Sequence, residues 1–283
     1  MTELPKITIV TPSLNQGAYI KEALLSVKQQ NYGNLEHLVI DGGSTDATLT
    51  ILRELSTSPG WDHLRWISEP DGGQSDALNK GFRLATGDLV GWLNSDDRYR
   101  PSAFDVISRV SRSNPDADVL YGDYTFIDSE GRLRQLRREI EFSRFILHYH
   151  RVLYIPTTAT FFRRRIFDEG NFLDEQLHYA MDYDFFLRLS ERGYGFQHVP
   201  ALLADFRVHA ESKSGAFCRQ QLREHDMLAR KHSPLLQLIE QHGGREVVFK
   251  VLRWVAAALR YSEKLLRGYY FPHRLRRERL EES

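Results

Sequence analysis

Short apolar runs alternate with helical patterns through the first hundred residues. Four runs rich in apolar and β-branched side chains predict buried strands over residues 7–11, 35–40, 64–68 and 89–93. Three segments between them carry apolar side chains at intervals of three and four, which predicts helices over residues 19–30, 45–55 and 74–85. This order is typical of a mostly parallel sheet with helices on its faces. We therefore predict an α/β fold of Rossmann-like architecture.

Polar side chains follow each of the predicted strands. They are Thr11, Ser13 and Asn15 after the first strand, Asp41 after the second, Glu69 and Asp71 after the third, and Asp96 and Asp97 after the fourth. Such sheets bind ligands beyond the carboxyl ends of their strands, so these side chains should form one rim. Loops begin with polar residues in any case, but that does not account for carboxylates at three of the four ends.

Two glycine-rich turns on this rim narrow the kind of ligand. The turns Asp41-Gly42-Gly43-Ser44 and Asp71-Gly72-Gly73-Gln74 would let a ligand approach the backbone closely. Neither has the glycine spacing of a dinucleotide-binding loop or of a phosphate loop with its lysine. The sequence therefore disfavours a Rossmann dehydrogenase and a P-loop nucleotidase.

The adjacent carboxylates of Asp96 and Asp97 indicate a cation. Two neighbouring carboxylates raise each other's pKa unless a positive charge lies between them. Mg²⁺ and Mn²⁺ bind carboxylate and phosphate oxygens together, so a nucleoside diphosphate would complete such a site. Helix capping explains the pair less well, because Ser102 is the better N-cap for the helix expected over residues 102–114.

The second half predicts further strands and a polar helix start. Strands are expected over residues 119–123, 157–162 and 201–206, with a hairpin turn at 128–131. In the helical segment within 174–191, Met181, Phe185 and Leu189 share one face, and Asp182 lies near its N-terminus. A purely structural explanation for Asp182 is that its carboxylate caps the helix N-terminus.

From about Gly244 the chain changes character. An apolar stripe at helical spacing is surrounded by basic residues and comprises Val247, Val248, Val251, Leu252, Val255, Leu259 and Leu266. Residues 245–283 contain 10 Lys or Arg and 5 Asp or Glu, whereas residues 1–244 contain 28 and 33. The stripe fits packing on the preceding domain or on a second subunit, and the aromatic and basic stretch 268–279 fits a membrane interface. A solvated basic face explains the charge equally well.

Composition excludes several protein classes. One cysteine, Cys218, rules out a disulfide framework and a cysteine-based metal site, and makes a reducing cytosol the expected compartment. The chain has no apolar run of the ~18–20 residues that span a bilayer. Residues 1–6 lead directly into the first strand, so we expect no secretory leader. No nucleic-acid-binding motif is present, and we expect no such partner.

Taken in order, the motifs resemble those of the family 2 glycosyltransferases of the GT-A fold. The resemblance covers about residues 5–215. It rests on Thr11-Pro12-Ser13-Leu14-Asn15, Asp41-Gly42-Gly43-Ser44-Thr45-Asp46, the segment 68–81, Gly87-Asp88, and Asn94-Ser95-Asp96-Asp97. It implies a GT-A domain over residues 1–215, followed by a helical, basic extension over residues 216–283.

The resemblance also implies a nucleotide-diphospho-sugar donor, most often a UDP-sugar, and a divalent metal, Mn²⁺ or Mg²⁺. By resemblance, Thr11, Pro12 and Ser13 line the nucleoside pocket, and Asp41 accepts a hydrogen bond from the base. Gln74 and Asn79 lie on the segment that closes over the donor. Asp96 binds the ribose or the metal, and Asp97 binds the metal. Asn15 and Ser95 belong to the same motifs and are included in the donor site.

In this family an aspartate just before a helix removes the proton from the acceptor hydroxyl. Asp182 matches that position, with Met181 where the family has an acid, and Asp184 is the alternative base or pairs with Arg188. The segment Arg207-Val208-His209-Ala210-Glu211-Ser212 resembles a late family motif. It makes His209 a metal ligand or phosphate contact, and Ser212 or Lys213 a diphosphate contact.

The sequence thus predicts a metal-dependent, inverting glycosyltransferase. It would move a sugar to a hydroxyl of a glycan or a lipid-linked acceptor, as in bacterial surface polysaccharide synthesis. We expect a cytoplasmic protein, which would lie at the inner face of the membrane if the C-terminal tail binds lipid. The sequence is compatible with a homodimer. Two alternatives remain, a sugar-1-phosphate nucleotidyltransferase and a non-catalytic sugar-nucleotide-binding protein.

Overall fold

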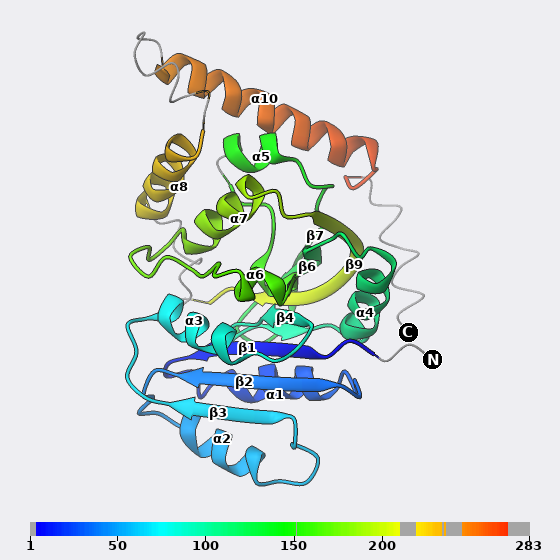
Figure 1. The fold of residues 1–283 in the computed structure, drawn as a ribbon, viewed down its shortest axis with the longest axis vertical. Coiled ribbons are helices and arrows are strands. Elements are labelled where there is room, and N and C mark those ends of the chain that lie inside the picture. The colour runs from blue at the N-terminus through cyan, green and yellow to red at the C-terminus, as the bar shows by residue number, and fades with distance from the viewer. Residues whose placement is uncertain (1–3, 151, 210–218, 234, 236–244, 271–283) are drawn as a thin grey trace.

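The computed structural model describes residues 4–150, 152–209, 219–233, 235 and 245–270 (Figure 1). The strands are β1 (Ile7–Ser13), β2 (Leu35–Asp41), β3 (Leu64–Ser68), β4 (Leu89–Trp92), β5 (Arg98–Tyr99), β6 (Val119–Ile127), β7 (Leu133–Arg137), β8 (Thr160–Arg163) and β9 (Phe196–Arg207). They form one nine-stranded sheet in the order β3-β2-β1-β4-β8-β6-β9-β5, with β7 paired to β6.

The helices fall between and after these strands. They are α1 (Ile20–Lys28), α2 (Thr48–Ser56), α3 (Gln74–Leu84), α4 (Ala103–Ser113), α5 (Arg144–Tyr149), the short 3₁₀ turn η1 (Thr157–Ala159), α6 (Arg165–Asp168), α7 (Met181–Glu191), α8 (Arg219–Lys231) and α10 (Arg245–Leu266). The predicted α/β class and the alternation of strand and helix through β4 are confirmed, with ends shifted by a few residues.

The first four strands are parallel, as the sequence predicted. β1 pairs with β2 and with β4, and β2 pairs with β3, all in parallel register. Ile7 and Ile9 of β1 pack in the cluster that includes α1 and α4, whereas Val10 packs in the cluster on the opposite face. Because successive side chains alternate between faces, the neighbouring apolar residues Ile9 and Val10 bury both sides of this central strand.

The second half of the sheet mixes directions. β8 is antiparallel to β4 and β6, β9 is parallel to β6, and the two-residue β5 is antiparallel to β9. β9 has 12 residues and begins earlier than the strand predicted over 201–206. Its pairing with β5 brings the carboxyl end of β9 beside the segment that follows β4. Arg207 and His209 thereby reach the rim formed by the first strands.

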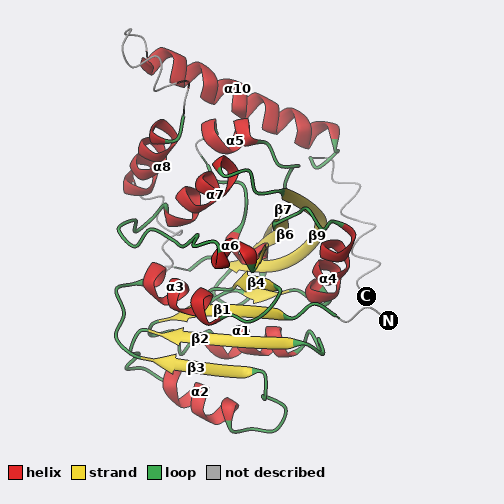
Figure 2. Ribbon diagram, in the orientation of Figure 1, coloured by secondary structure: helices red, strands yellow, loops and turns green. Residues whose placement is uncertain are grey.

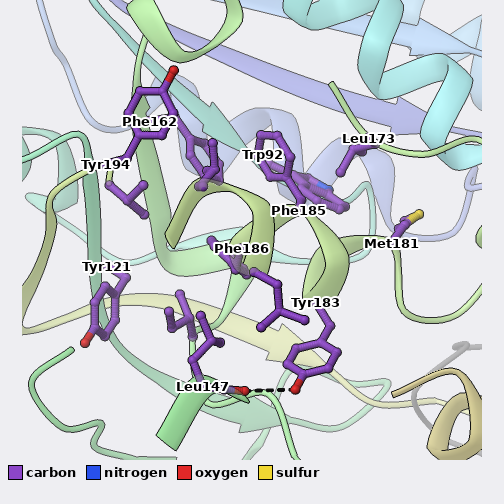
Figure 3. Packing of buried hydrophobic residues seen from close by; sticks show 14 of the residues in the cluster. Trp92, Tyr121, Leu147, Phe162, Leu173, Met181, Tyr183, Phe185, Phe186 and Tyr194 are labelled. Atoms are coloured by element: carbon purple, nitrogen blue, oxygen red, sulfur yellow. Dashed lines mark hydrogen bonds between the residues drawn. The ribbon is translucent and has the colours of Figure 1, made fainter. Parts of the chain in front are cut away.

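Helices cover both sides of the sheet (Figure 2). On one side, α7 supplies Phe185 and Phe186 to a large apolar cluster that also holds Trp92 and Phe162 (Figure 3). The hydroxyl of Tyr183 donates to the carbonyl of Leu147 at 2.9 Å, which ties α7 to α5 (Figure 3). The start of α7 is therefore held by a packed core and does not depend on its loop alone.

The prediction that the Ser102 side chain caps α4 is wrong. Ser102 does precede α4, but it has a φ of 62° and its side chain makes no capping hydrogen bond. A capping serine needs an extended backbone to bring its hydroxyl over the first turn, which the left-handed conformation prevents.

The C-terminal helices pack on this body. α10 lies along α5 at one end of the molecule, and α8 lies beside α7 (Figure 1). The buried carboxylate of Glu139 holds Arg260 and Lys264 of α10 at 2.8 and 3.0 Å. In the part of the chain that the structure describes, no helix is both long and apolar enough to cross a membrane. Ser212 and Lys213 lie outside the described residues, and the division at residue 215 stays a prediction.

Candidate active site

A cavity of about 400 Å³ opens at the carboxyl ends of β1 and β4. The first turns of α3 and α7, the end of β9 and the start of α8 complete its wall. Seven of the residues predicted from sequence line it: Pro12, Ser13, Gln74, Ser95, Asp96, Asp182 and His209. The other five, Thr11, Asn15, Asp41, Asn79 and Asp97, are absent from its lining. The single rim predicted from the strand ends is therefore present, with part of the predicted set behind it.

Two polar atoms of this wall lack partners within the described protein. The hydroxyl of Ser13 and the side-chain oxygen of Gln16 are buried and accept or donate no hydrogen bond among the described residues. Both residues line the cavity; Ser13 is the last residue of β1, and Gln16 lies in the loop that follows it. Buried polar groups are almost always paired, so these two atoms fit a polar ligand that would pair with them.

Asp96 and His209 meet at the floor of the cavity. The Nε2 atom of His209 lies 3.0 Å from Oδ2 of Asp96, and the imidazole ring leans on Tyr19 at 4.8 Å between centroids. No group of three or more His, Cys, Asp or Glu side chains converges in the described residues. The carboxylate oxygen suits Mn²⁺ or Mg²⁺ when phosphate oxygens supply further ligands, and the imidazole nitrogen beside it favours Mn²⁺, the softer of the two ions.

Arg207 fixes the segment that carries Asp96. Its guanidinium is buried and donates to the carbonyl of Asp96 at 2.7 Å, while its backbone N–H donates to Oδ1 of Asp97 at 2.8 Å. The same guanidinium forms an ion pair with Glu22 of α1 at 2.5 Å. Two hydrogen bonds from Arg207 thus hold the segment of Asp96 and Asp97, and the ion pair with Glu22 fixes the guanidinium that makes one of them.

Asp97 lies beneath the cavity floor. It is 1% exposed, and Oδ2 accepts from the hydroxyl of Thr158 at 2.6 Å and from the amide of Asn94 at 3.1 Å. Burial, followed by the negative charge of Asp96, raises the pKa of Asp97 well above its usual range. Its oxygens are engaged within the protein, so its geometry suits support of the floor.

The other four residues behind the cavity hold its loops. Asp41 is fully buried and accepts hydrogen bonds from Gly43, Ser44 and Ser68. The side-chain oxygen of Asn15 accepts from the backbone of Thr45 at 2.9 Å, which joins the loops after β1 and β2.

Thr11 and Asn79 complete this supporting set. The Thr11 hydroxyl lies 2.9 Å from Nε2 of His37 on the neighbouring strand. Asn79 of α3 donates to the carbonyl of Leu173 at 3.0 Å and accepts from its N–H at 2.9 Å. Asn79 thereby holds the loop that leads to α7.

Asp182 occupies the first turn of α7 and faces the cavity. Its side chain is partly exposed, and burial raises its pKa, with His225 acting in the opposite direction. The neighbouring Met181 accepts a hydrogen bond from the Ser75 hydroxyl at 2.8 Å, so the starts of α3 and α7 touch across the cavity wall. A carboxylate of raised pKa at a cavity wall can accept a proton from a bound hydroxyl.

Asp184, the alternative base, is engaged elsewhere. It is buried and forms an ion pair with Arg188 at 2.6 Å, as the spacing of four predicted. Burial acts to raise its pKa, but hydrogen bonds from His232 and Arg188 outweigh it, and the pKa is lowered. Asp184 does not line the cavity. The structure therefore favours Asp182 over Asp184 as the base.

A glutamate of α8 supplies the cap that α7 lacks. Ala180 occupies the N-cap position and has no side chain to pair with the exposed N–H groups. The carboxylate of Glu224 accepts from the N–H groups of Tyr179 and Ala180, each at 3.0 Å. A carboxylate at a helix N-terminus is also favoured by the helix dipole. Glu224 thus fixes the backbone two residues before Asp182.

Replacing Glu224 with alanine should lower kcat by roughly 10-fold to 100-fold, because small displacements of a reacting group cost that much. KM for the donor should change little, and Glu224→Gln should recover part of the loss, since its oxygen still accepts. Steady-state kinetics of both variants provide the measurement. Arg223→Ala, on the exposed neighbour, is the control. Equal losses in kcat for Arg223→Ala would refute the positioning role.

Sequence reasoning missed several side chains of the wall. Tyr179, Phe206 and Gln221 line the cavity but come from a loop, the end of β9 and α8. Asn94 links three parts of the floor, since its side-chain oxygen accepts from Gln74 at 3.0 Å and from Trp92 at 2.9 Å. Asn94 was visible as part of the motif with Asp96, whereas the others carry no local signal.

The chain is similar in sequence to known glycosyltransferases. The model of the family described as glycosyl transferase family 2 matches residues 8–170. An uncharacterised glycosyltransferase of Mycobacterium tuberculosis is 34% identical over 191 residues, which are 66% of this chain and 70% of the relative. The chondroitin synthase of Escherichia coli is 30% identical over 222 residues, 76% of this chain but 30% of the synthase.

Solved structures share the fold. Residues 1–349 of Staphylococcus aureus TarS, in complex with UDP-GlcNAc, superimpose with a TM-score of 0.65 and 19% identity, over 80% of this chain and 66% of TarS 1–349. A mannosyltransferase of Pyrobaculum calidifontis, in complex with GDP-Man and Mn²⁺, gives a TM-score of 0.63 and 19% identity, over 91% of this chain and 74% of that protein. At this identity the likeness concerns the fold.

Proposed function

Since the chain belongs to glycosyltransferase family 2 and has a GT-A fold, we propose that it transfers a sugar from a nucleotide-diphospho-sugar to a hydroxyl group. The observation that carries the donor is the pair of unpaired polar atoms on Ser13 and Gln16, in a cavity that also holds Asp96, His209 and Asp182. A UDP-sugar is the first donor to test, because UDP-GlcNAc is the ligand of the TarS structure.

Each lining residue has a task in this proposal. Ser13 and Gln16 pair with the nucleotide, and Asp96 with His209 holds a divalent metal. Such a metal, when bound, stabilises negative charge on the departing diphosphate. Asp97, Arg207 and the loops behind the cavity keep Asp96 in place. Asp41, Thr11, Asn15 and Asn79 act on the donor through the loops that they hold.

The chemistry is a single displacement with inversion. Asp182 takes the proton of the acceptor hydroxyl as its oxygen bonds to the anomeric carbon of the donor. The bond from that carbon to the diphosphate oxygen breaks, and the nucleoside diphosphate leaves with the electron pair. Tyr179 lies three residues before Asp182 and lines the cavity with it, so we assign the acceptor to that side, and Phe206 and Gln221 line the same cavity.

The acceptor is proposed to be a glycan or a lipid-linked sugar. Support comes from the similarity to the Escherichia coli chondroitin synthase, a polysaccharide synthase. The chain spans less than a third of that protein's length. We place the enzyme at the cytoplasmic face of the membrane, where lipid-linked acceptors would be available. The two alternatives, a nucleotidyltransferase and a non-catalytic binder, gain nothing from the family match. The loop over residues 11–17 also lacks the basic residue that a nucleotidyltransferase would need there.

The direct test is product formation. The purified chain is incubated with UDP-sugars and GDP-sugars, with Mn²⁺ or with a chelator, and nucleoside diphosphate release is measured with and without candidate oligosaccharide acceptors. We expect diphosphate release that depends on metal and rises with the right acceptor. Pyrophosphate-dependent formation of a sugar phosphate would instead identify a nucleotidyltransferase.

The raised pKa of Asp182 predicts the pH dependence. The base must be ionised, so kcat should fall as pH falls through its pKa in the complex. Burial puts that pKa above the usual aspartate value of about 3.9, so the acidic limb should lie at higher pH than an exposed aspartate would give. A pH profile of kcat between about pH 3.5 and 8.5, which includes the usual aspartate pKa, gives the measurement. A rate that stays flat down to the usual aspartate pKa contradicts this role of Asp182.

A further inference from the structure

The helix α10 exposes a strip of apolar residues to solvent, while Arg253, Arg260, Glu263 and Lys264 face the protein. Eight large apolar residues are exposed along it: Val247, Val251, Trp254, Val255, Leu259, Tyr261, Leu265 and Leu266. Trp254 is 79% exposed and Leu266 is 88% exposed. We call this strip the outer face of α10. Single exposed apolar residues are ordinary, but a continuous strip along a helix marks a contact surface.

The side of α10 that contacts the protein, which we call its inner face, fixes the rotation of the helix and therefore the exposure of the outer face. Arg260 and Lys264 are buried against the body, where both contact the carboxylate of Glu139. Phe249 and Ala256 are buried in the large cluster on the same side. The buried ion pairs fix the rotation of the helix, because turning it would leave Glu139 unpaired in the interior. The apolar strip is therefore held outward by the fold.

We infer that the outer face of α10 docks on the surface of a lipid bilayer. Beyond Lys250, the charged residues of α10, which are Arg253, Arg260, Glu263 and Lys264, are all buried or partly buried. No exposed charge then interrupts the strip from Val251 to Leu266. α10 also lies at one end of the long axis of the molecule, so the strip can reach a flat surface (Figure 1). A helix lying in the interface with Trp and Leu on its buried side has this form.

A second copy of the chain fits the strip less well. A helix of 22 residues is about 33 Å long, and a strip about 10 Å wide gives roughly 330 Å². A stable protein interface buries about 800 Å² on each partner. The strip alone is well short of that area, whereas interfacial binding needs only one apolar side of a helix.

The segment that follows α10 in the sequence, residues 271–283, is also a poor cover. Residues 271–283 contain 4 Arg and 3 Glu among 13 residues, and the outer face beyond Lys250 offers those charges no partner. Four arginines between residues 273 and 279 suit anionic lipid headgroups instead. The charge and the apolar strip thus favour the same partner, an anionic bilayer.

The test is flotation of the full chain with vesicles of phosphatidylcholine and phosphatidylglycerol. The double variant Val251→Glu/Leu259→Glu should lower the vesicle-bound to free ratio at least 10-fold. The matched control is Leu84→Glu/Leu133→Glu, which places the same charge on two similarly exposed apolar residues of α3 and β7. The control should bind as the wild type does.

Trp254 provides a second readout, because the other three tryptophans are buried or partly buried. Vesicles should shift its emission to the blue, and Trp254→Phe should abolish the shift. Equal binding of wild type and double variant would overturn the inference, as would a wild type that fails to float. A dimer that the double variant dissociates would identify a second copy instead. Donor hydrolysis, measured without vesicles, should be unchanged in the double variant, so failure of the proposed function would be seen separately.

Discussion

Replacing Asp182 with asparagine is expected to lower kcat by about 10²–10⁴-fold, the usual contribution of a general base. Asparagine has nearly the same shape and can still accept the hydrogen bond from the backbone of Tyr183, 2.7 Å from the carboxylate. The variant should therefore fold and bind the donor normally. What it loses is the ability to take a proton from the acceptor hydroxyl.

The control for this prediction is Asp184→Asn on the same helix. Asp184 pairs with Arg188 and His232 away from the cavity, so this variant should lose stability and keep most of its kcat. Thermal unfolding and steady-state kinetics of both variants separate the two effects. Asp182→Asn with more than a tenth of wild-type kcat would remove Asp182 from the base role.

Replacing Asp96 with asparagine is expected to abolish the metal dependence of donor binding. Asp96 carries the carboxylate that faces the cavity and meets His209 at 3.0 Å. Substitutions of residues behind metal ligands cost about 10–100-fold in affinity or activity, so loss of a ligand itself should cost at least about 100-fold in kcat/KM. The measurement compares kcat/KM of wild type and variant across a Mn²⁺ titration.

Asp97→Asn is the matched control, one residue away. Asp97 is buried under the cavity floor and accepts from Thr158 and from the backbone of Arg207. Losing part of this network should cost about 1–3 kcal/mol of stability. The metal dependence should remain. If Asp97→Asn loses metal dependence and Asp96→Asn keeps it, the assignment of the two aspartates is reversed.

The sequence predicted the half of the fold whose strands are buried on both faces. β1, β2 and β4 are almost fully buried and rich in apolar residues, with Thr8, Glu36 and His37 as polar exceptions, and polar residues end or follow each strand. Long-range pairing was harder to predict. β9 contains Gln197, His198 and Pro200, which break the apolar run, yet it pairs along β6 in the structure. The cross-strand partner, and not the local pattern, sets the length of β9.

The site divides in the same way. Residues that end a strand or begin a helix, such as Ser13, Asp96 and Asp182, could be predicted because topology carries them to one edge. Glu224 could not, because nothing in α8 indicates that its carboxylate caps α7. Likewise Asp41 and Asn79 stand in the predicted motifs, but only the three-dimensional contacts show that their polar atoms bind neighbouring loops.

The most direct test of the account is a calorimetric titration of UDP into wild type, Asp96→Asn and Asp182→Asn, each with and without Mn²⁺. The account predicts metal-dependent UDP binding to wild type and to Asp182→Asn, and its loss in Asp96→Asn. GDP is titrated in parallel, and a preference for GDP would change the donor while keeping the site. Absence of binding by either nucleotide to the folded wild type, or UDP binding that neither Mn²⁺ nor Asp96→Asn alters, would contradict the donor site built around Asp96.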